Sequence, residues 1–488
     1  MKKSYIIHLI VVIFIILNII NLKNLSLIDW DEGTFALQAK WLASMGLDGK
    51  PFNFQTPPLF QIIIAILFKI LGCQDWILPF ISIVFSAIIL YIIFLLGKEL
   101  YNETIGLLAV VIFISTEYFL FFSKSGLSDA IFLFFFITAI YFFNRSLEKK
   151  HNIYYLYCGI FTLLACYTKY TGPILFLIFL IIGINRRKQL NKYWLLFTIV
   201  IPILLLLPYL LIFIRIITIP GITQRYGKLL GINHLKFLYY LIRFAPLIFI
   251  TAIFYRMKSK TDHFILIIIV IFFFVLGFYY PYFRLAFPLI PLFSLFSAGF
   301  LYQFKKLRYY LLGLIFLLNI FLGFNTITYH SNIPPSIGQK VESLCKLYNT
   351  NYVFALTPPN MVFYLDGSIL QSDTHVPVRL TNIGYLKGSG FLKIGDNLLK
   401  NQKRVLFVYS SIFEDFEKKF KPLKSMANLT DSIEFIDAPI YDKDLFNPLR
   451  SKKQIYEIYL FEIEKLDTLS LNNLWEIGLL RGSTVIRK

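Results

Sequence analysis

Three carboxylates, Asp29, Asp31 and Glu32, stand within four positions directly after a long apolar run. A charged side chain at the centre of a bilayer costs about 2.5–3.5 kcal/mol on insertion scales, so three together would cost on the order of 8–10 kcal/mol. We therefore expect this cluster at a membrane boundary or in a wet cavity, where a carboxylate can act as a general base. The alternative is a solvated interfacial loop whose acidic residues have no chemical role.

Three further ionisable residues lie at the ends of apolar runs. Asp129 opens the run in "GLSDAIFLFFF", Lys169 lies in "CYTKYTGP", and Arg284 lies in "YYPYFRLAFPLIP". The bland alternative is that each basic side chain only extends to the interface while its stem stays in the apolar region. If the apolar runs form one bundle, however, these residues close onto one cavity. Cations and carboxylates together suit an anionic lipid headgroup beside a base.

The elements that must position these residues are membrane helices. The chain has 488 residues, of which 57% are hydrophobic and 16% are charged, and its mean hydropathy is +0.67. Soluble domains have roughly 25% charged residues, so the composition indicates an integral membrane protein. The net charge of +20 falls mostly in short loops between apolar runs, which makes nucleic-acid binding an unlikely function class.

Eleven apolar runs are long enough to be read as spans. They lie near 4–22, 76–97, 104–122, 127–144, 152–169, 171–185, 193–215, 236–255, 262–280, 283–303 and 309–326. Lys and Arg cluster in every second connection, which places those loops and the N-terminus in the cytoplasm. The acidic cluster, Asp129, Lys169 and Arg284 then face the outside.

The first outer loop is predicted to carry two short interfacial helices. Phe35, Ala39, Leu42 and Met45 form one stripe of an amphipathic helix that begins near Glu32. Pro57 and Pro58 start a second apolar segment of about fourteen residues, which is short for a span and suits an interfacial or re-entrant helix.

The character of the chain changes after about residue 327. Charges of both signs interleave, β-like runs appear at 352–356, 404–410, 432–438 and 455–464, and helical stretches lie between them. This alternation predicts an α/β domain. The expected organisation is a polytopic α-helical membrane domain over 1–326 and an extracytoplasmic α/β domain over 327–488.

Motifs across the membrane part resemble the GT-C superfamily of polyprenyl-phosphate-sugar glycosyltransferases. The nearest resemblance is to the protein O-mannosyltransferase and lipid A aminoarabinose transferase group. "DEGTFALQAKWLASMG" is similar to that group's opening of the first outer loop, and "GKPFNFQTPPLFQ" to its "PPL" segment. The start "SKSGLSD", the turn "YTKYTGP" and the helix "YFRLAFPLIP" resemble its later motifs. Each motif is weak alone, but their order over about 330 residues is jointly specific.

The resemblance implies a membrane glycosyltransferase, in the hexosyltransferase class, that works at the outer face of the cytoplasmic membrane. It would move a sugar from a polyprenyl-phosphate donor to an acceptor hydroxyl or amine on a protein, lipid or glycan, with inversion. It assigns Asp31 as the base, Glu32 as its partner, Lys169 and Arg284 as the donor-phosphate ligands, and Asp129 to a supporting or acceptor-positioning role. Asp29 and Lys124 are expected to be bystanders.

In one respect the chain departs from the aminoarabinose branch, which has a Glu-Lys pair where this chain has Gln55 and Thr56. This departure argues against a metal or phosphate site at that position and against an aminoarabinose substrate. The six His residues show no HxxxH-type spacing, so a catalytic metal is not indicated, although the sequence does not exclude a divalent ion, and no cofactor is assigned.

Two other function classes remain as alternatives. A transporter or flippase of lipid-linked glycans would show inverted repeats and charges near the midplane, and we find no repeat in the sequence. A non-catalytic sensor with a ligand-binding outer domain would leave the acidic first loop without a purpose.

Overall fold

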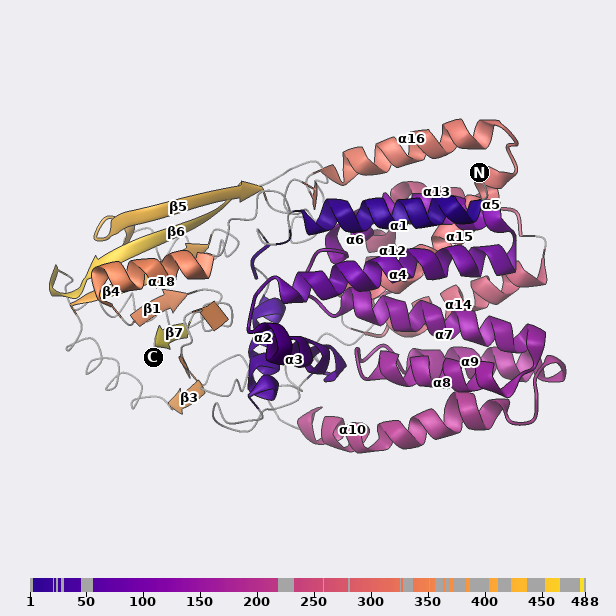
Figure 1. Cartoon of the computed structure of the whole chain (residues 1–488), viewed down its shortest axis with the longest axis horizontal. Helices are drawn as coiled ribbons and strands as arrows, with labels where there is room; N and C mark the ends of the chain where they lie inside the picture. The colour runs from indigo at the N-terminus through magenta and orange to yellow at the C-terminus, as the bar shows by residue number, and fades with distance from the viewer. Residues whose placement is uncertain are drawn as a thin grey trace.

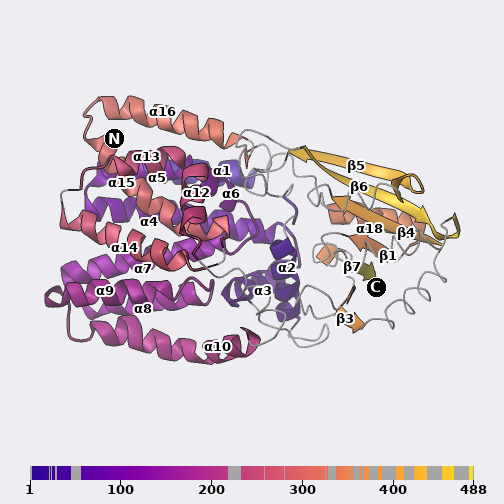
Figure 2. The ribbon, with the colours of Figure 1, turned by 180° about the vertical axis from the view of Figure 1, so that it is seen from behind.

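The computed structural model describes residues 3–20, 22, 25–27, 30–44, 56–217, 232–257, 259–279, 281–324, 326–327, 337–350, 352–355, 363–364, 368–372, 383–386, 403–410, 423–436, 453–465 and 483–486. Helices fill one end of the molecule and a β-sheet lies at the other (Figure 1). Two short helices, α2 (Trp30–Ala43) and α3 (Leu59–Leu71), lie between these ends, as the reverse view also shows (Figure 2). Asp29, Met45 and Gln55 lie outside the described residues.

Each apolar run predicted from the sequence contains helix within the described residues. The helices are α1 (Lys3–Ile19), α4 (Ile77–Leu100), α5 (Glu103–Ile114), α6 (Glu117–Phe122), α7 (Asp129–Lys149), α8 (Asn152–Cys166), α9 (Ile174–Asn185), the π-helical turn η3 (Leu196–Val200) with α10 (Ile201–Ile217), α12 (His234–Phe244), α13 (Pro246–Ile253), α14 (Lys260–Leu276), the 3-10 helix η4 (Phe283–Leu289) with α15 (Ile290–Tyr302), and α16 (Leu307–Leu322). A further 3-10 turn, η2 (Arg187–Gln189), lies in the loop after α9.

Among the described helices, three are long and apolar enough to cross a membrane by themselves: Ile77–Leu100, Asp129–Lys149 and Phe283–Tyr302. The pair α12–α13 makes a fourth if it is counted as one span. Seven other apolar helices have 10–17 residues, and at 1.5 Å per residue the longest of them reaches about 25 Å, against a hydrocarbon core of about 30 Å. The chain is therefore a helical protein of membrane type, and the count of eleven spans stays a prediction.

Two predicted spans are interrupted. In the run 104–122 the helix breaks between α5 and α6, where the Thr116 hydroxyl accepts a hydrogen bond from Phe119 N and caps the second piece. In the run 236–255 the axis bends by 107° between α12 and α13. Pro246 begins α13, and Ala245 before it leaves the helical region, because a residue that precedes proline is disfavoured there. At each of these two places the predicted span is therefore broken and is not one continuous helix.

The predicted helices of the first loop are present, but the burial of α2 differs from the expectation. Phe35 and Ala39 of the predicted stripe are buried, as is Glu32 on the same face, and so are Thr34 and Gln38, which lie outside the stripe. A single apolar stripe was therefore too narrow a prediction. Helix α2 is covered on several sides because it packs on α3 and lies between the helical end and the sheet (Figure 1).

The sheet has seven described strands in the order β3-β2-β7-β1-β4-β6-β5. They are β1 (Tyr352–Ala355), β2 (Ser368–Ser372), β3 (Ile383–Leu386), β4 (Arg404–Ser410), β5 (Asn428–Ile436), β6 (Lys453–Glu462) and β7 (Ser483–Ile486), followed after β6 by the 3-10 turn η7 (Ile463–Lys465). The pairing is mixed, since β1 runs parallel to β4 while β6 runs antiparallel to both β4 and β5. The amphipathic helix α18 (Ile337–Tyr348) lies beside the sheet (Figure 1).

Helices α4 and α5 approach so closely that only glycine fits at their contact. A Cβ on Gly106 would lie 2.6 Å from the carbonyl oxygen of Phe94, and a Cβ on Gly97 would lie 2.7 Å from the Cα of Gly106. Both obstacles are backbone atoms, so neither can move aside like a flexible side chain.

This contact predicts that Gly106→Ala destabilises the protein by about 1–3 kcal/mol, because the two helices must separate. Gly313→Ala is the matched control, since a Cβ there meets nothing within 4 Å and alanine favours a helix by about 0.5–1 kcal/mol. Thermal unfolding of the purified protein in detergent measures both variants. Equal melting temperatures for the two would contradict the close approach.

Candidate functional site

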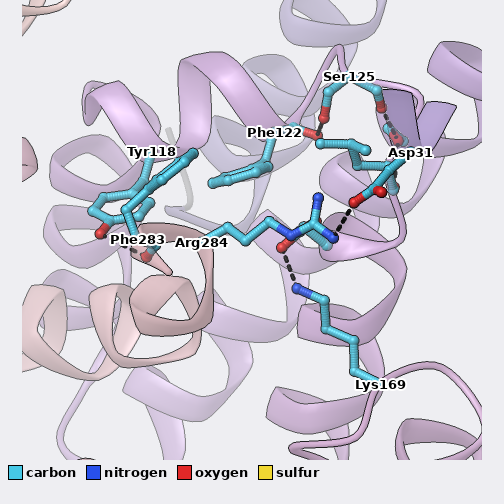
Figure 3. A network of polar contacts seen from close by, with 10 residues as sticks. Asp31, Tyr118, Phe122, Ser125, Lys169, Phe283 and Arg284 are labelled. Atoms are coloured by element: carbon cyan, nitrogen blue, oxygen red, sulfur yellow. Dashed lines mark hydrogen bonds and ion pairs between the residues drawn. The ribbon is translucent and has the colours of Figure 1, made fainter. Parts of the chain in front are cut away.

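Asp31 lies in the first turn of α2, where the positive end of the helix dipole favours a carboxylate. Its Oδ2 accepts a hydrogen bond of 2.7 Å from Nη2 of Arg284, which belongs to η4. Figure 3 shows the guanidinium reaching across to Asp31 while Lys169 approaches the same place from another element. The structure thus joins two predicted site residues that stand 253 positions apart in the chain.

Asp129 is the first residue of α7 and forms an ion pair with Lys169 in the turn between α8 and α9. The other carboxylate oxygen of Asp129 lies 3.9 Å from Nε of Arg284. Asp31, Arg284, Asp129 and Lys169 therefore form one chain of alternating charges, which we call the charge cluster. It draws on α2, η4, α7 and the α8–α9 turn.

Solvent exposure separates the members of the charge cluster. The side chain of Asp129 is 1% exposed, that of Lys169 10% and that of Arg284 12%, whereas Asp31 is 40% exposed. A buried charge is stable only when it is paired, so Asp129 and Lys169 depend on each other. Asp31 is the carboxylate that an incoming molecule can reach.

Glu32 is the other predicted catalytic residue, and its observed bond is to the backbone. Its Oε1 accepts a 2.7 Å hydrogen bond from the backbone N–H of Gly126, in the connection between α6 and α7. A Cβ on Gly126 would lie 2.9 Å from Leu78 Cβ and 3.4 Å from Glu32 Cγ, so glycine permits this approach. Glu32 therefore fixes the start of α2 against the connection that leads to Asp129. Sequence reasoning missed the part of Gly126, although the quoted "SKSGLSD" contains it.

An aromatic wall holds the backbone that carries Arg284. The Tyr118 hydroxyl donates to the carbonyl oxygen of Phe283 at 3.0 Å, and the Tyr118 ring stacks on Phe287 with an interplanar angle of 8°. Phe122 packs on Phe287 with ring centroids 4.9 Å apart, and the guanidinium of Arg284 lies 4.9 Å from the ring centroid of Tyr282. Figure 3 shows Tyr118, Phe122 and Phe283 on the side of Arg284 away from Asp31.

Sequence reasoning also missed an ion pair inside the helical end. Glu117 at the start of α6 lies 3.5 Å from Nη1 of Arg243 in α12 and accepts a 3.0 Å hydrogen bond from the Thr326 hydroxyl. The signal was available, because both charged residues fall within predicted apolar spans, where an ionisable residue needs a partner.

Thr56 and its surroundings form an uncharged polar cluster where the aminoarabinose branch has charged residues. Thr56, Gln38 of α2 and Gln61 of α3 lie within hydrogen-bond distance of one another, with 2.9 Å between the Gln61 and Gln38 side chains. Within the described parts of the chain, no group of three or more His, Cys, Asp and Glu side chains could hold a metal ion.

Comparison with known proteins places the fold. Residues 55–212 match the family model described as dolichyl-phosphate-mannose-protein mannosyltransferase, and no curated protein matches the sequence. The structure of ArnT from Cupriavidus metallidurans bound to undecaprenyl phosphate is similar, with a TM-score of 0.58 and 12% identity over 96% of this chain and 99% of that chain.

Two oligosaccharyltransferase structures from Archaeoglobus fulgidus are also similar. An oligosaccharyltransferase complex with Zn and sulfate has a TM-score of 0.53 and 14% identity, over 88% of this chain and 72% of that chain. The complex of AglB with an inhibitory peptide and a dolichol-phosphate has a TM-score of 0.50 and 11% identity, over 92% of this chain and 76% of that chain. At these identities the likeness concerns the fold.

The Glu32–Gly126 bond predicts different outcomes for two substitutions. Glu32→Gln keeps an oxygen that can accept from Gly126 N–H and is expected to unfold within about 0.5 kcal/mol of the wild type. Glu32→Ala leaves a buried donor without its acceptor and is expected to cost about 1–3 kcal/mol. Chemical or thermal unfolding in detergent compares the pair. Equal losses in both variants would show that the charge of Glu32 matters rather than its hydrogen bond.

Proposed function

We propose that this chain, which has the fold of the GT-C superfamily that its sequence motifs resemble, is a membrane glycosyltransferase of the hexosyltransferase class. In this proposal it takes a sugar from a polyprenyl-phosphate donor and transfers it, with inversion, to a hydroxyl or amine of a protein, lipid or glycan. The observation that carries the proposal is the charge cluster, in which a reachable carboxylate, Asp31, lies directly against a cation, Arg284.

The reaction needs a base and a sink for negative charge, and the charge cluster supplies both. The acceptor oxygen or nitrogen attacks the anomeric carbon while the bond from that carbon to the phosphate oxygen breaks. Asp31 takes the acceptor proton, and the bonding electrons leave with the polyprenyl phosphate. One carboxylate is enough when the configuration inverts, because no covalent sugar–enzyme intermediate is formed.

The leaving phosphate gains negative charge as the bond breaks, so fixed cations stabilise the transition state. Arg284 offers a planar fork that matches two phosphate oxygens, and Lys169 offers a compact charge beside it. We assign the stabilisation of this negative charge to Arg284 and Lys169, which both belong to the charge cluster. ArnT bound to undecaprenyl phosphate and AglB in complex with a dolichol-phosphate support a lipid of this class.

In the proposed mechanism, the 2.7 Å hydrogen bond between Arg284 and Asp31 links binding of the donor to the availability of the base. Without a bound donor, the guanidinium pairs with Asp31. A donor phosphate that binds the guanidinium in place of Asp31 lets this carboxylate accept the acceptor proton. Asp129 and Glu32 then hold position rather than react, Asp129 by pairing with Lys169 and Glu32 through Gly126.

The proposed topology places this chemistry at the outer face of the cytoplasmic membrane. Asp31 of the charge cluster belongs to α2, which lies between the helical end and the sheet (Figure 1). The basic loops contact one another away from the charge cluster. Arg186 donates a hydrogen bond of 2.7 Å to the carbonyl oxygen of Lys260, and Lys150 donates one of 3.4 Å to the carbonyl oxygen of Lys188. We infer that these loops and the N-terminus are cytoplasmic, that eleven spans cross the membrane within 1–326, and that 327–488 is an extracytoplasmic α/β domain that helps to select the acceptor.

A flippase of lipid-linked glycans is the runner-up and is less favoured. Alternating access requires a site that opens to both sides near the midplane between repeats. The charge cluster lies instead at helix ends. Its members Asp129 and Lys169 are buried against each other, whereas a site that opens to both sides in turn has to change its contacts.

The proposal predicts that Asp31→Asn lowers transfer by about 10²–10⁴-fold, because the base is lost, while binding of polyprenyl phosphate is not weakened. The substitution removes the carboxylate charge that pairs with Arg284 Nη2, so a phosphate meets less competition for the guanidinium. Arg284→Lys is the contrasting variant: it keeps the charge, loses the fork, and is expected to weaken binding of polyprenyl phosphate. Mass spectrometry of the glycolipids of a deletion strain first identifies the donor. Transfer from this donor is then measured with native membranes that contain each variant. Wild-type transfer by Asp31→Asn would exclude Asp31 as the base.

A further inference from the structure

We propose that Tyr364, in the part of the chain that follows the membrane helices, is a positioning residue for Asp31. Its hydroxyl holds the short segment that leads into α2, so the sheet-bearing part of the chain sets the place of the carboxylate at the site. This inference rests on the function proposed for Asp31.

The Tyr364 hydroxyl links three segments that are remote in sequence. It accepts a hydrogen bond of 2.9 Å from the backbone N–H of Leu27 and donates one of 2.9 Å to Oδ2 of Asp75. The other oxygen of Asp75 accepts from the backbone N–H of Trp76 at 2.8 Å, and Trp76 precedes the first residue of α4. The segment before α2 is thereby tied to the start of α4 through one phenol.

The ring of Tyr364 is clamped as firmly as its hydroxyl. A Cβ on Gly338, in α18, would lie 2.0 Å from Cγ of Tyr364, so α18 packs directly on the ring. The neighbouring Phe363 packs on Phe68 of α3 with ring centroids 6.0 Å apart. Burial, followed by the charge of Asp75, raises the pKa of Tyr364 well above its ordinary value, which keeps the hydroxyl protonated as a donor.

The tie matters because it lies close to Asp31 along the chain. Residues 25–27 are outside the helices, and the side chains of Leu25 and Leu27 are buried. Their backbone groups therefore need partners other than helical ones. Helix α2 begins at Trp30, and Asp31 is its second residue. We expect a displacement of Leu27 to change the distance between Asp31 and Arg284, and an error of about 1 Å at a reacting group can cost on the order of 100-fold in rate.

Tyr364→Phe tests this role, with Tyr155→Phe as the matched control. The Tyr155 hydroxyl also accepts from a backbone N–H, that of Asn191 at 3.0 Å, and donates to a backbone carbonyl, that of Ser146 at 3.3 Å. These hydrogen bonds of Tyr155 lie beside the basic loop that contains η2, because Asn191 follows that turn. We expect Tyr364→Phe to lower kcat of transfer at least about 10-fold with the KM for the donor lipid unchanged. Tyr155→Phe is expected to leave both parameters at wild-type values.

Hydrogen–deuterium exchange of the full-length protein reads the position without relying on activity. In Tyr364→Phe the amides of residues 25–33 are expected to exchange at least about 10-fold faster, while those of Tyr155→Phe keep the wild-type rate. Gly338→Ala displaces the ring by a second route and is expected to raise the same exchange. Unchanged exchange in 25–33 in both Tyr364→Phe and Gly338→Ala would overturn the positioning role. Faster exchange combined with wild-type kcat would overturn the link to catalysis. A wild-type protein that transfers no sugar from a polyprenyl-phosphate donor would overturn the proposed function and leave the exchange result standing.

Discussion

The cost of burying charge is the constraint on which the rest of this structure depends. Asp129 is 1% exposed, and a carboxylate so far from water is stable only beside a cation that is fixed by its own surroundings. Lys169 meets this need from the α8–α9 turn, and Arg284 adds a second cation from η4. Because no single segment carries both signs at the right place, helices α7, α8 and α15 must pack so that their ends converge. The ion pairs that require the helix ends to converge therefore also set the geometry of the site.

The charge cluster is also balanced within itself, with two carboxylates and two cations. An added anion disturbs that balance, and the disturbance falls on the most exposed member, Asp31. Deeply buried Asp129 and Lys169 stay as they are, since separating them would leave both charges unpaired. In the function proposed above, binding of an anionic headgroup and the availability of the Asp31 carboxylate are therefore coupled through electrostatics. The aromatic wall behind Arg284 supports this by restricting the guanidinium to small movements.

Residue types at the ends of apolar runs were sufficient to pick out Asp31, Asp129, Lys169 and Arg284, because an ionisable group beside lipid is costly enough to need a reason. The helical regions and the strands at 352–355 and 404–410 also followed from hydrophobic pattern. What the sequence could not give are contacts between distant segments. The Glu32–Gly126 bond joins positions 94 apart, and the Tyr118–Phe283 bond joins positions 165 apart. The break at Thr116 and the bend at Pro246 are local, and they were missed because hydropathy averages over a window that hides one capping hydroxyl or one proline.

The phenol of Tyr364 has a consequence for how such proteins can be recombined. Its three partners lie in the segment before α2, at the start of α4 and in α18, so the sheet-bearing part cannot be exchanged as an independent cassette. A chimera that joins the helices of this chain to the terminal part of a relative keeps these contacts only if a tyrosine, an aspartate and a glycine occupy the three matching positions together. The contacts therefore favour inheritance of the two parts as one unit over their exchange between proteins.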